Sequence, residues 1–439
     1  MSQLIKVGVI SLGCDKNRVD TEKMLAVLSA KYLLTSDIYD ADVIIINTCA
    51  FLESARKEAV EEILQASTLK EDGKLQKLIV TGCLPQKFVN ELFDELTEVD
   101  AFLGVSDYDK LLYVLDEVFR GKRVNAVGEP KGEVGTNRVL TTSGYAYLKI
   151  ADGCFNRCSY CLIPHIRGNY RSVPKADILN EVDKLGTVDE LILVAQDTTR
   201  YGIEVKDGYN IVSLLRDISA KENVKSIRLL YCYPEGITDE LINEFKTNDK
   251  LIKYIDMPLQ HASDKILKLM RRRGTMDGYL QLIDKLKSEV KGIAIRSTFI
   301  AGFPGETEED FNNLTNFLQK AKLFNAGFFK YSREYGTPAY DFDNQVPQRT
   351  KYNRVRKLYS IQRKISRQNL KSFVGKTLNV YAEGFDDNSF TYYGRAYFNA
   401  PDIDGKVLFT SETPIEYGKT YQVKVIDCTD YDIIASVIK

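Results

Sequence analysis

Tryptophan is absent from this 439-residue chain, and histidine occurs only twice, at His165 and His261. So few imidazoles argue against a histidine-bound zinc or non-haem iron site, so thiolates would have to hold any metal. The net charge is −1, which gives no overall signature of a nucleic-acid-binding protein. No apolar run approaches the ~20 residues of a membrane helix, and the first residues lack the segments of a signal peptide. We therefore expect a cytoplasmic protein that makes no contact with a membrane.

Eight cysteines are present, and in a cytoplasmic protein they are more often metal ligands or buried thiols than disulfides. The length is too great for one ordinary core and predicts about three domains. We expect an N-terminal domain, a linker, a central domain, a basic helical connector and a small C-terminal domain, over 1–126, 127–144, 145–348, 349–372 and 373–439.

Short apolar runs alternate with helical patterns in the first segment, which predicts a doubly wound parallel sheet. The runs at 5–13, 42–48 and 77–82 are typical of buried strands, and each leads into a cysteine. These three cysteines are Cys14, Cys49 and Cys83. Because the carboxyl ends of parallel strands meet at one edge of a sheet, we expect the thiols to converge in a metal site. Three unrelated core thiols are the alternative.

The central segment resumes the alternation of strands and helices after a Gly- and Thr-containing linker. Strands are expected at 145–150, 190–196, 226–233, 253–259, 292–301 and 326–332. Six units are two short of a closed eight-stranded barrel, so we predict a partial βα barrel with an open lateral mouth. Residues 349–371 hold nine basic side chains and no acidic one, and we expect a helix there. The short strands and turns after residue 373 predict a small antiparallel β-barrel.

A second cysteine triplet follows the first strand of the predicted barrel. Cys154, Cys158 and Cys161 form a C-x3-C-x2-C pattern within ADGCFNRCSYCLIPHIRG. A structural zinc site would need a fourth ligand, for which His165 is the nearby candidate. A 4Fe–4S cube has four irons, so three thiolates leave one iron open for another ligand. The pattern therefore favours an incomplete, functional iron–sulfur site over a structural metal site.

The stretch GCFNRCSYC closely resembles the signature of the radical S-adenosylmethionine enzymes. The resemblance implies that this triplet holds a 4Fe–4S cluster whose open iron binds S-adenosylmethionine, and that reductive cleavage produces a 5′-deoxyadenosyl radical. In these enzymes, later strand ends bind the rest of the cofactor. The corresponding candidates here are Gln196, Asp197, Arg296 and Ser297 as polar contacts, and Gly302 and Gly305 for close backbone approach. Ordinary loop or barrel charges are the alternative for Asp197 and Arg296.

The whole chain resembles the methylthiotransferase family, which joins a three-cysteine domain, a radical domain and a TRAM-type β-barrel. Matching segments include SLGCDKNRVDTE, NTCAFLESARKEA, VTGCLPQ and DMPLQHASDKILKLMRRRG. The resemblance implies that Cys14, Cys49 and Cys83 hold a second 4Fe–4S cluster whose open iron presents the sulfur. It also implies one S-adenosylmethionine for the methyl group, another for the radical, and an electron donor such as a flavodoxin or ferredoxin.

Two branches of this family differ in substrate. The RimO type modifies the β-carbon of an aspartate in ribosomal protein S-twelve, and the MiaB type modifies isopentenylated adenosine in tRNA. The Lys16-Asn17 pair after Cys14 and the segment 394–407 resemble the RimO type, although Asp15 stands where that branch usually has proline. We therefore expect the protein substrate.

Charge provides a separate indication of the substrate. Residues 375–439 contain six Lys and Arg against ten Asp and Glu, whereas a domain that binds tRNA phosphates should be basic. An acidic barrel suits a basic ribosomal protein. The basic stretch 349–371 favours the tRNA alternative, unless it is a solvated helix face. A non-catalytic iron–sulfur protein that binds RNA or the ribosome is the third possibility.

Overall fold

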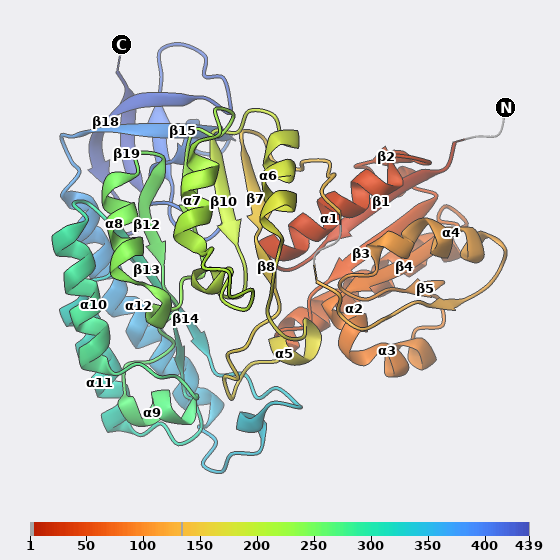
Figure 1. The fold of residues 1–439 in the computed structure, drawn as a ribbon, viewed down its shortest axis with the longest axis horizontal. Coiled ribbons are helices and arrows are strands. Elements are labelled where there is room, and N and C mark those ends of the chain that lie inside the picture. Colours follow the sequence, from red (N-terminus) through yellow and green to blue (C-terminus); the bar gives the residue numbers. More distant parts are fainter. Residues whose placement is uncertain (1–3, 133–134, 439) are drawn as a thin grey trace.

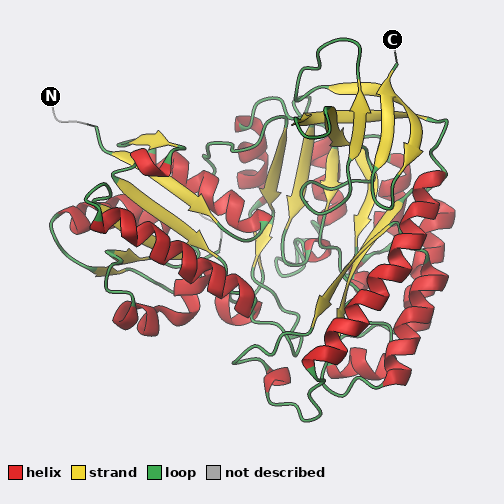
Figure 2. Ribbon diagram, turned by 180° about the vertical axis from the view of Figure 1, so that it is seen from behind, coloured by secondary structure: helices red, strands yellow, loops and turns green. Residues whose placement is uncertain are grey.

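The computed structural model describes residues 4–132 and 135–438. Three large sheets follow one another along the described chain: a six-stranded N-terminal sheet, a six-stranded central sheet and a closed five-stranded barrel. In Figures 1 and 2 the N-terminal part lies beside the central sheet, and the small barrel lies over one end of the central strands.

The N-terminal sheet is parallel throughout, with the strand order β2-β1-β3-β4-β5-β6. Its strands are β1 (Lys6–Ser11), β2 (Leu33–Thr35), β3 (Val43–Thr48), β4 (Lys77–Gly82), β5 (Ala101–Phe102) and β6 (Val124–Asn125). Its helices are α1 (Asp15–Leu28), α2 (Glu53–Glu71), α3 (Cys83–Glu95) and α4 (Leu111–Phe119). The α2 and α3 helices pack in one hydrophobic cluster with the sheet, and α1 and α4 pack in another. The predicted doubly wound sheet is therefore confirmed.

The central sheet has its six parallel strands in sequential order, from β7 at one edge to β14 at the other. They are β7 (Tyr145–Lys149), β10 (Glu190–Val194), β11 (Ile227–Leu229), β12 (Leu251–Asp256), β13 (Ala294–Ala301) and β14 (Asn325–Lys330). The helices between them are α6 (Lys175–Lys184), α7 (Ile211–Ser219), α8 (Asp239–Thr247), α9 (Asp264–Leu269), α10 (Met276–Glu289) and α11 (Glu308–Ala321). In the described residues β14 does not pair with β7. The partial barrel is confirmed.

The inserted segment between β7 and α6 carries the second cysteine triplet. It contains β8 (Ala151–Asp152), α5 (Ile163–Ile166) and β9 (Arg171–Ser172), and β8 pairs with β9 as a small antiparallel ribbon. This ribbon fixes both ends of the cysteine loop against the sheet.

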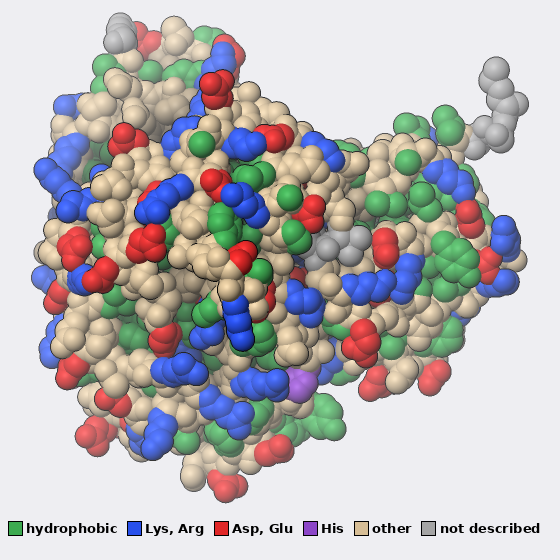
Figure 3. All heavy atoms as spheres, viewed as in Figure 1, with side chains coloured by type: hydrophobic (Ala, Val, Ile, Leu, Met, Phe, Trp, Pro, Cys, Tyr) green, Lys and Arg blue, Asp and Glu red, His purple; other side chains and the backbone are tan. Residues whose placement is uncertain are grey.

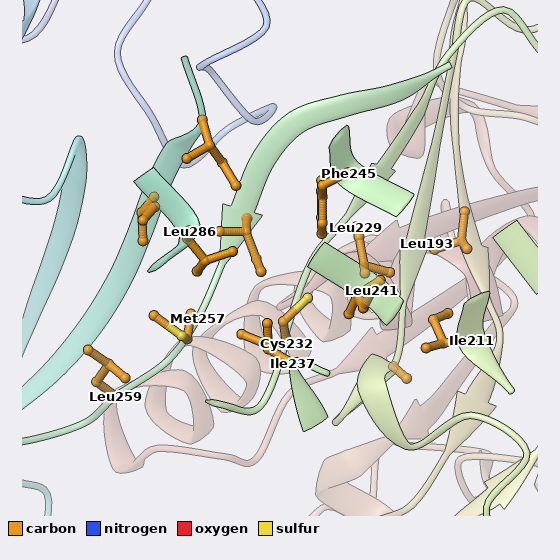
Figure 4. Close-up of a cluster of buried hydrophobic side chains, with 14 of the residues drawn as sticks. Leu193, Ile211, Leu229, Cys232, Ile237, Leu241, Phe245, Met257, Leu259 and Leu286 are labelled. Carbon is orange, nitrogen blue, oxygen red and sulfur yellow. The ribbon is translucent and has the colours of Figure 1, made fainter. Parts of the chain in front are cut away.

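Aliphatic side chains between the central sheet and its helices form the largest core of the molecule. Figure 4 shows part of this core, where Cys232 lies among Leu229, Ile237 and Met257. Cys232 is fully buried, as is nearly all of Cys428 in the C-terminal barrel, so both thiols pack as predicted.

The basic stretch forms α12 (Gln348–Lys371), a helix whose apolar side packs on the central domain through Leu358 and Ile365. The barrel that follows comprises β15 (Thr377–Asp386), β16 (Thr391–Arg395), β17 (Val407–Thr410), β18 (Thr420–Cys428) and β19 (Ile433–Val437). The β17 and β19 strands pair in parallel, so the wholly antiparallel barrel that we predicted is wrong in this detail. Five strands cannot alternate direction around a closed circle, and one parallel pair is therefore required.

The barrel is attached at the amino-terminal ends of the central strands. Apolar side chains of the inner sheet face, such as Tyr147 and Ile192, share a core with barrel residues such as Phe398. Glu190, the first residue of β10, pairs with Arg228 and with Arg395 of the barrel, the latter at 2.8 Å. No helix of the described residues is long and apolar enough to cross a membrane.

Candidate active site

Cys14, Cys49 and Cys83 follow three strands that lie side by side in the N-terminal sheet. Cys14 precedes α1, Cys49 directly follows β3, and Cys83 begins α3 directly after β4. The β3 strand pairs with both β1 and β4, so the three thiols gather at one sheet edge. The approach is close enough that a Cβ atom at Gly13 would lie 2.8 Å from the Cys49 Cβ. Gly13, with φ +95°, is thus required by this crowding.

Burial and the proximity of the other thiols both raise the pKa values of Cys49 and Cys83 in this triplet. Burial raises the pKa of Cys83 to about 12, the guanidinium of Arg167 lowers it, and the neighbouring thiols of Cys49 and Cys14 raise it further. Burial also raises the pKa of Cys49, against the hydrogen bond from the Phe51 backbone. Such thiols ionise readily only when a cation replaces the proton, because the cation then stabilises the thiolate.

The second triplet lies on the loop that follows β8. Backbone amides donate to two of its sulfurs, Asn156 to Cys154 at 3.3 Å and Ile163 to Cys161 at 3.4 Å. The Cys158 sulfur lies 2.9 Å from the Tyr233 hydroxyl. Burial raises the pKa of Cys154 to about 11, and the Asn156 amide lowers it. Amide and hydroxyl donors directed at sulfur are typical of thiolates that hold an iron–sulfur cluster.

All six cysteines line one cavity of about 380 Å³ between the N-terminal and central domains. In the described residues no group of three or more His, Cys, Asp or Glu side chains converges closely enough to hold one metal ion. A 4Fe–4S cube binds each thiolate to a different iron, so its ligands do not meet at one point. Three thiolates in each triplet are a donor set that fits a 4Fe–4S cluster with one iron left open.

The predicted cofactor contacts divide into two groups. Gln196 and Arg296 line the cavity of the cysteines. Asp197 is fully buried and accepts hydrogen bonds from Asn156, Thr199 and Arg200. Asp197 therefore holds the cysteine loop and does not line the cavity.

The other three predicted contacts also lie away from the described lining of the cavity. Ser297 is fully buried, and its hydroxyl accepts a hydrogen bond from the Leu259 amide at 3.2 Å. Gly302 and Gly305 both have positive φ. A Cβ atom at Gly302 would lie 2.3 Å from the Lys351 side chain, so this glycine makes room for α12. A contact of these residues with a cofactor stays a prediction.

Arg167 is the main residue that sequence reasoning missed. It is 2% exposed and donates to Asp152 at 3.0 Å, to Asp20 at 3.0 Å and to Asn17 at 2.7 Å. Its Nη2 also lies 3.7 Å from the Cys83 sulfur. One guanidinium thus joins the loop of the second triplet to the site of the first. Its position six residues after Cys161 was the available signal.

A second buried cation lies on the other side of the cavity. The guanidinium of Arg272 lies 3.9 Å from the centre of the Tyr233 ring, and Tyr233 contacts the Cys158 sulfur. Lys16 is placed similarly near the first triplet, 3.3 Å from the ring centre of Tyr231. These cations balance the negative charge that two sets of thiolates would bring.

Comparison with known proteins agrees with this arrangement. Residues 6–104 match the uncharacterized protein family UPF0004, residues 148–318 match the radical SAM superfamily, and residues 374–438 match the TRAM domain. A relative from Acetivibrio thermocellus, named ribosomal protein uS12 methylthiotransferase RimO, is 45% identical over 99% of this chain and 98% of its own. Relatives of the same name from Thermoanaerobacter sp. and Caldanaerobacter subterraneus subsp. tengcongensis are 44% and 46% identical over 98% of this chain and 99% of theirs.

The chain belongs to the RimO family. The expected membership is thus confirmed, and with it the radical S-adenosylmethionine domain. A RimO protein of this kind uses S-adenosylmethionine and 4Fe–4S clusters, and two clusters agree with the two cysteine-bearing domains.

Solved structures support the fold alone. The cobalamin-dependent S-adenosylmethionine radical enzyme OxsB in its apo form is 12% identical, with a TM-score of 0.54 over 82% of this chain and 61% of that one. The same enzyme with aqua-cobalamin bound gives a TM-score of 0.52 over 82% of this chain, which spans 56% of that protein's length.

Proposed function

We propose that this protein transfers a methylthio group to the β-carbon of an aspartate in ribosomal protein uS12. Its RimO relatives are named for uS12, and the aspartate follows from the resemblance to the RimO branch. The observation that carries the proposal is the single cavity that both cysteine triplets line. A reaction that cleaves a C–H bond and then adds sulfur needs both centres to reach the same carbon atom, and one shared cavity allows this.

Each triplet has its own role in the proposal. Cys154, Cys158 and Cys161 would hold the cluster that binds S-adenosylmethionine, and Cys14, Cys49 and Cys83 would hold the cluster that presents sulfur. When bound, these groups supply the electron, the hydrogen-abstracting radical, the methyl group and the sulfur.

Gln196 has the geometry of a cofactor contact. Its Nε2 donates to the Asp152 carboxylate at 3.0 Å, which fixes the orientation of the amide. Its buried Oε1 has no hydrogen-bond partner among residues 4–132 and 135–438. A buried acceptor without a partner is costly unless a ligand donates to it. We infer that Gln196 accepts a hydrogen bond from an amino or hydroxyl group of S-adenosylmethionine.

We infer that the C-terminal barrel presents the substrate. A cavity of about 610 Å³ is lined by Cys14, Asp15 and Arg18 of the N-terminal domain and by Asp402 and Ile403 of the barrel. A segment of uS12 held on the barrel could therefore reach the sulfur-presenting triplet. The acidic balance of the barrel suits a basic ribosomal protein.

A tRNA substrate is the second candidate, and the basic helix α12 is the observation that favours it. Part of its charge is used inside the molecule, however. Arg354 pairs with Glu306 at 2.8 Å, and Lys351 donates to the Tyr331 carbonyl. Arg363 and Arg367 lie 3.6 and 3.5 Å from Asp430 of the barrel. These contacts leave less positive charge for phosphates and favour the protein substrate.

Two cysteine variants separate an enzyme from a non-catalytic iron–sulfur protein. Cys154→Ala should abolish reductive cleavage of S-adenosylmethionine, and persistent cleavage would contradict the assignment of the radical cluster. Cys49→Ala should still cleave S-adenosylmethionine but form no methylthio product. Cys428→Ala, a buried thiol of the barrel, is the matched control and should keep both activities. The domain limits, the cytoplasmic location and the electron donor remain predictions that these variants do not test.

A further inference from the structure

The outer side of the second cysteine loop carries a concentration of arginines. A cavity of about 290 Å³ opens there, and five of its lining residues are arginines against one acidic residue, Glu235. The arginines are Arg157, Arg200, Arg271, Arg272 and Arg273. Figure 3 shows Lys and Arg side chains gathered on this face between α5 and α9. We call this surface the arginine patch.

Three of these side chains are exposed and form no ion pair within the described residues. They are Arg157, Arg271 and Arg273. By contrast, Arg200 pairs with Asp197 at 3.1 Å, and Arg272 is buried against Tyr233. Like charges held close together without partners repel one another, so an external anionic partner would be stabilised here.

The patch includes part of the loop that carries the second triplet. Phe155 and Arg157 lie between Cys154 and Cys158 in the chain, and both line the arginine cavity. Phe155 is 43% exposed although it is a large apolar side chain. The inner side of the same loop faces the six-cysteine cavity. A partner on the patch would therefore approach the second triplet without entering the space where substrate and cofactor must meet.

We propose that the arginine patch docks an acidic one-electron donor protein, one that carries a reduced flavin or an iron–sulfur centre. This rests on the proposed function, because reductive cleavage of S-adenosylmethionine consumes one electron per event. The donor would be oxidised by one electron, which the cluster held by Cys154, Cys158 and Cys161 would pass to S-adenosylmethionine. The bond between the sulfonium sulfur and the 5′-carbon would then break, giving methionine and the 5′-deoxyadenosyl radical. Because electron transfer weakens steeply with distance, docking must occur next to this loop.

RNA phosphates would also be attracted to arginines, but the observations favour a protein donor. The patch is small, it includes the exposed ring of Phe155, and the chain as a whole carries a net charge of −1. A site that must hold tRNA or ribosomal RNA through phosphates usually needs a longer basic surface. Weak electron-transfer complexes instead use small charged interfaces.

The test uses the full-length, cluster-loaded protein and a reduced flavodoxin as the donor. The variant is Arg271→Glu together with Arg273→Glu, and the matched control is Arg356→Glu, an exposed residue of α12. The dissociation constant for flavodoxin is measured at several salt concentrations, and 5′-deoxyadenosine formation is measured with flavodoxin and, separately, with dithionite, which needs no docking site. Iron content is measured to confirm equal cluster loading.

We expect the double variant to bind flavodoxin about tenfold or more weakly at low salt and to lose the salt dependence of wild-type binding. Its flavodoxin-driven rate should fall while its dithionite-driven rate stays within about twofold of wild type, and the control should behave as wild type. Unchanged flavodoxin binding would overturn the proposal. An equal fall in the rate of 5′-deoxyadenosine formation with flavodoxin and with dithionite would also overturn it. Loss of binding to an RNA oligonucleotide without loss of flavodoxin binding would assign the patch to RNA instead. If wild-type protein formed no 5′-deoxyadenosine with dithionite, the proposed function would fail. The flavodoxin-binding measurement alone would then decide whether the arginine patch docks a donor.

Discussion

The Nη2 atom of Arg167 lies 3.0 Å from the Asp20 carboxylate, across the boundary between the central and N-terminal domains. Both side chains are almost fully buried. Arg167 belongs to the segment of the second triplet, and Asp20 belongs to α1, which begins next to Cys14. The ion pair therefore fixes the distance between the two cysteine triplets, on which a shared reaction cavity depends.

Replacing Arg167 should disturb the first triplet more than the second. In Arg167→Met, the buried carboxylates of Asp20 and Asp152 lose one cationic partner and keep the other, Lys149. We therefore expect a cost below the ~3–5 kcal/mol of a buried charge left with no partner. We expect a lower free energy of unfolding and loss of methylthio product, while part of the cleavage of S-adenosylmethionine remains. Chemical denaturation and product analysis by mass spectrometry check this. The exposed Arg120, which pairs with Glu117 on the surface, provides the control variant Arg120→Met, expected to change stability by less than about 1 kcal/mol.

Tyr233 should tune the cluster of the second triplet. Burial raises the pKa of its hydroxyl well above the ordinary value, against the effect of Arg272, so the hydroxyl keeps its proton at neutral pH. When Cys158 is a thiolate it has no proton to donate, and the hydroxyl would then donate the hydrogen bond to its sulfur. Such a hydrogen bond stabilises the more negative, reduced cluster. Tyr233→Phe should lower the reduction potential by an amount on the order of tens of millivolts.

An anaerobic redox titration followed by electron paramagnetic resonance measures this shift. Tyr201→Phe is a suitable control, because the Tyr201 hydroxyl donates to the Val173 carbonyl at 2.8 Å and not to a cysteine. An unchanged potential in Tyr233→Phe would show that this hydroxyl does not act on the cluster.

The attachment of the C-terminal barrel should depend on pH through Glu190. Burial alone raises the pKa of this carboxyl, but Arg228 and Arg395 lower it further than burial raises it, and the net shift is downward. Its contribution to stability is therefore fully present above the pKa of glutamate in the unfolded chain, about 4.3, and is lost as pH falls through the lower folded value. Glu190→Gln should reduce the thermal midpoint at pH 7 by several degrees.

The lowered pKa of Glu190 also determines how the effect of Glu190→Gln on the thermal midpoint depends on pH. Between wild type and Glu190→Gln, the difference in thermal midpoint should be constant from pH 7 to about 5 and shrink below about 4. Differential scanning calorimetry across this range measures it. A difference that grows on acidification would contradict the assigned direction of the pKa shift.

Asp402 tests the route of the substrate. Its side chain is 65% exposed, lies 3.6 Å from Arg18, and lines the cavity that leads to Cys14. Asp402→Arg should raise KM for uS12 several-fold, because it places a positive charge where we expect a basic protein to pass. Cleavage of S-adenosylmethionine without uS12 should not change. Asp387→Arg, at an exposed turn of the same barrel, is the control, and equal effects of the two variants would contradict this route.

The sequence predicts those features of the site that follow from strand order. Cys14, Cys49 and Cys83 gather because three parallel strands are adjacent, and the C-x3-C-x2-C loop needs no distant partner to form. Local pattern therefore determined the positions of the six candidate cysteine ligands.

The features that the sequence did not predict depend on contacts between domains. Arg167 lies near the sulfur of Cys83, and Tyr233 lies near the sulfur of Cys158. Each pair is far apart in the sequence, so local sequence pattern does not predict the contact. Gly302 follows a strand end as a cofactor contact would, yet the side chain of Lys351 in α12 occupies the space beside it. Asp197 accepts hydrogen bonds from Asn156 of the cysteine loop and from Thr199 and Arg200 of its own segment, and a contact of Asp197 with the cofactor stays a prediction.

One competition experiment tests the central claim most directly. The protein is reconstituted with iron and sulfide without oxygen, and S-adenosylmethionine and a reductant are added with both ribosomal protein uS12 and isopentenylated tRNA present. Mass spectrometry then determines which of the two gains a methylthio group. We predict the modification on an aspartate of uS12 and none on the tRNA. Modification of the tRNA alone would contradict the proposed substrate and would assign the basic helix α12 to RNA binding.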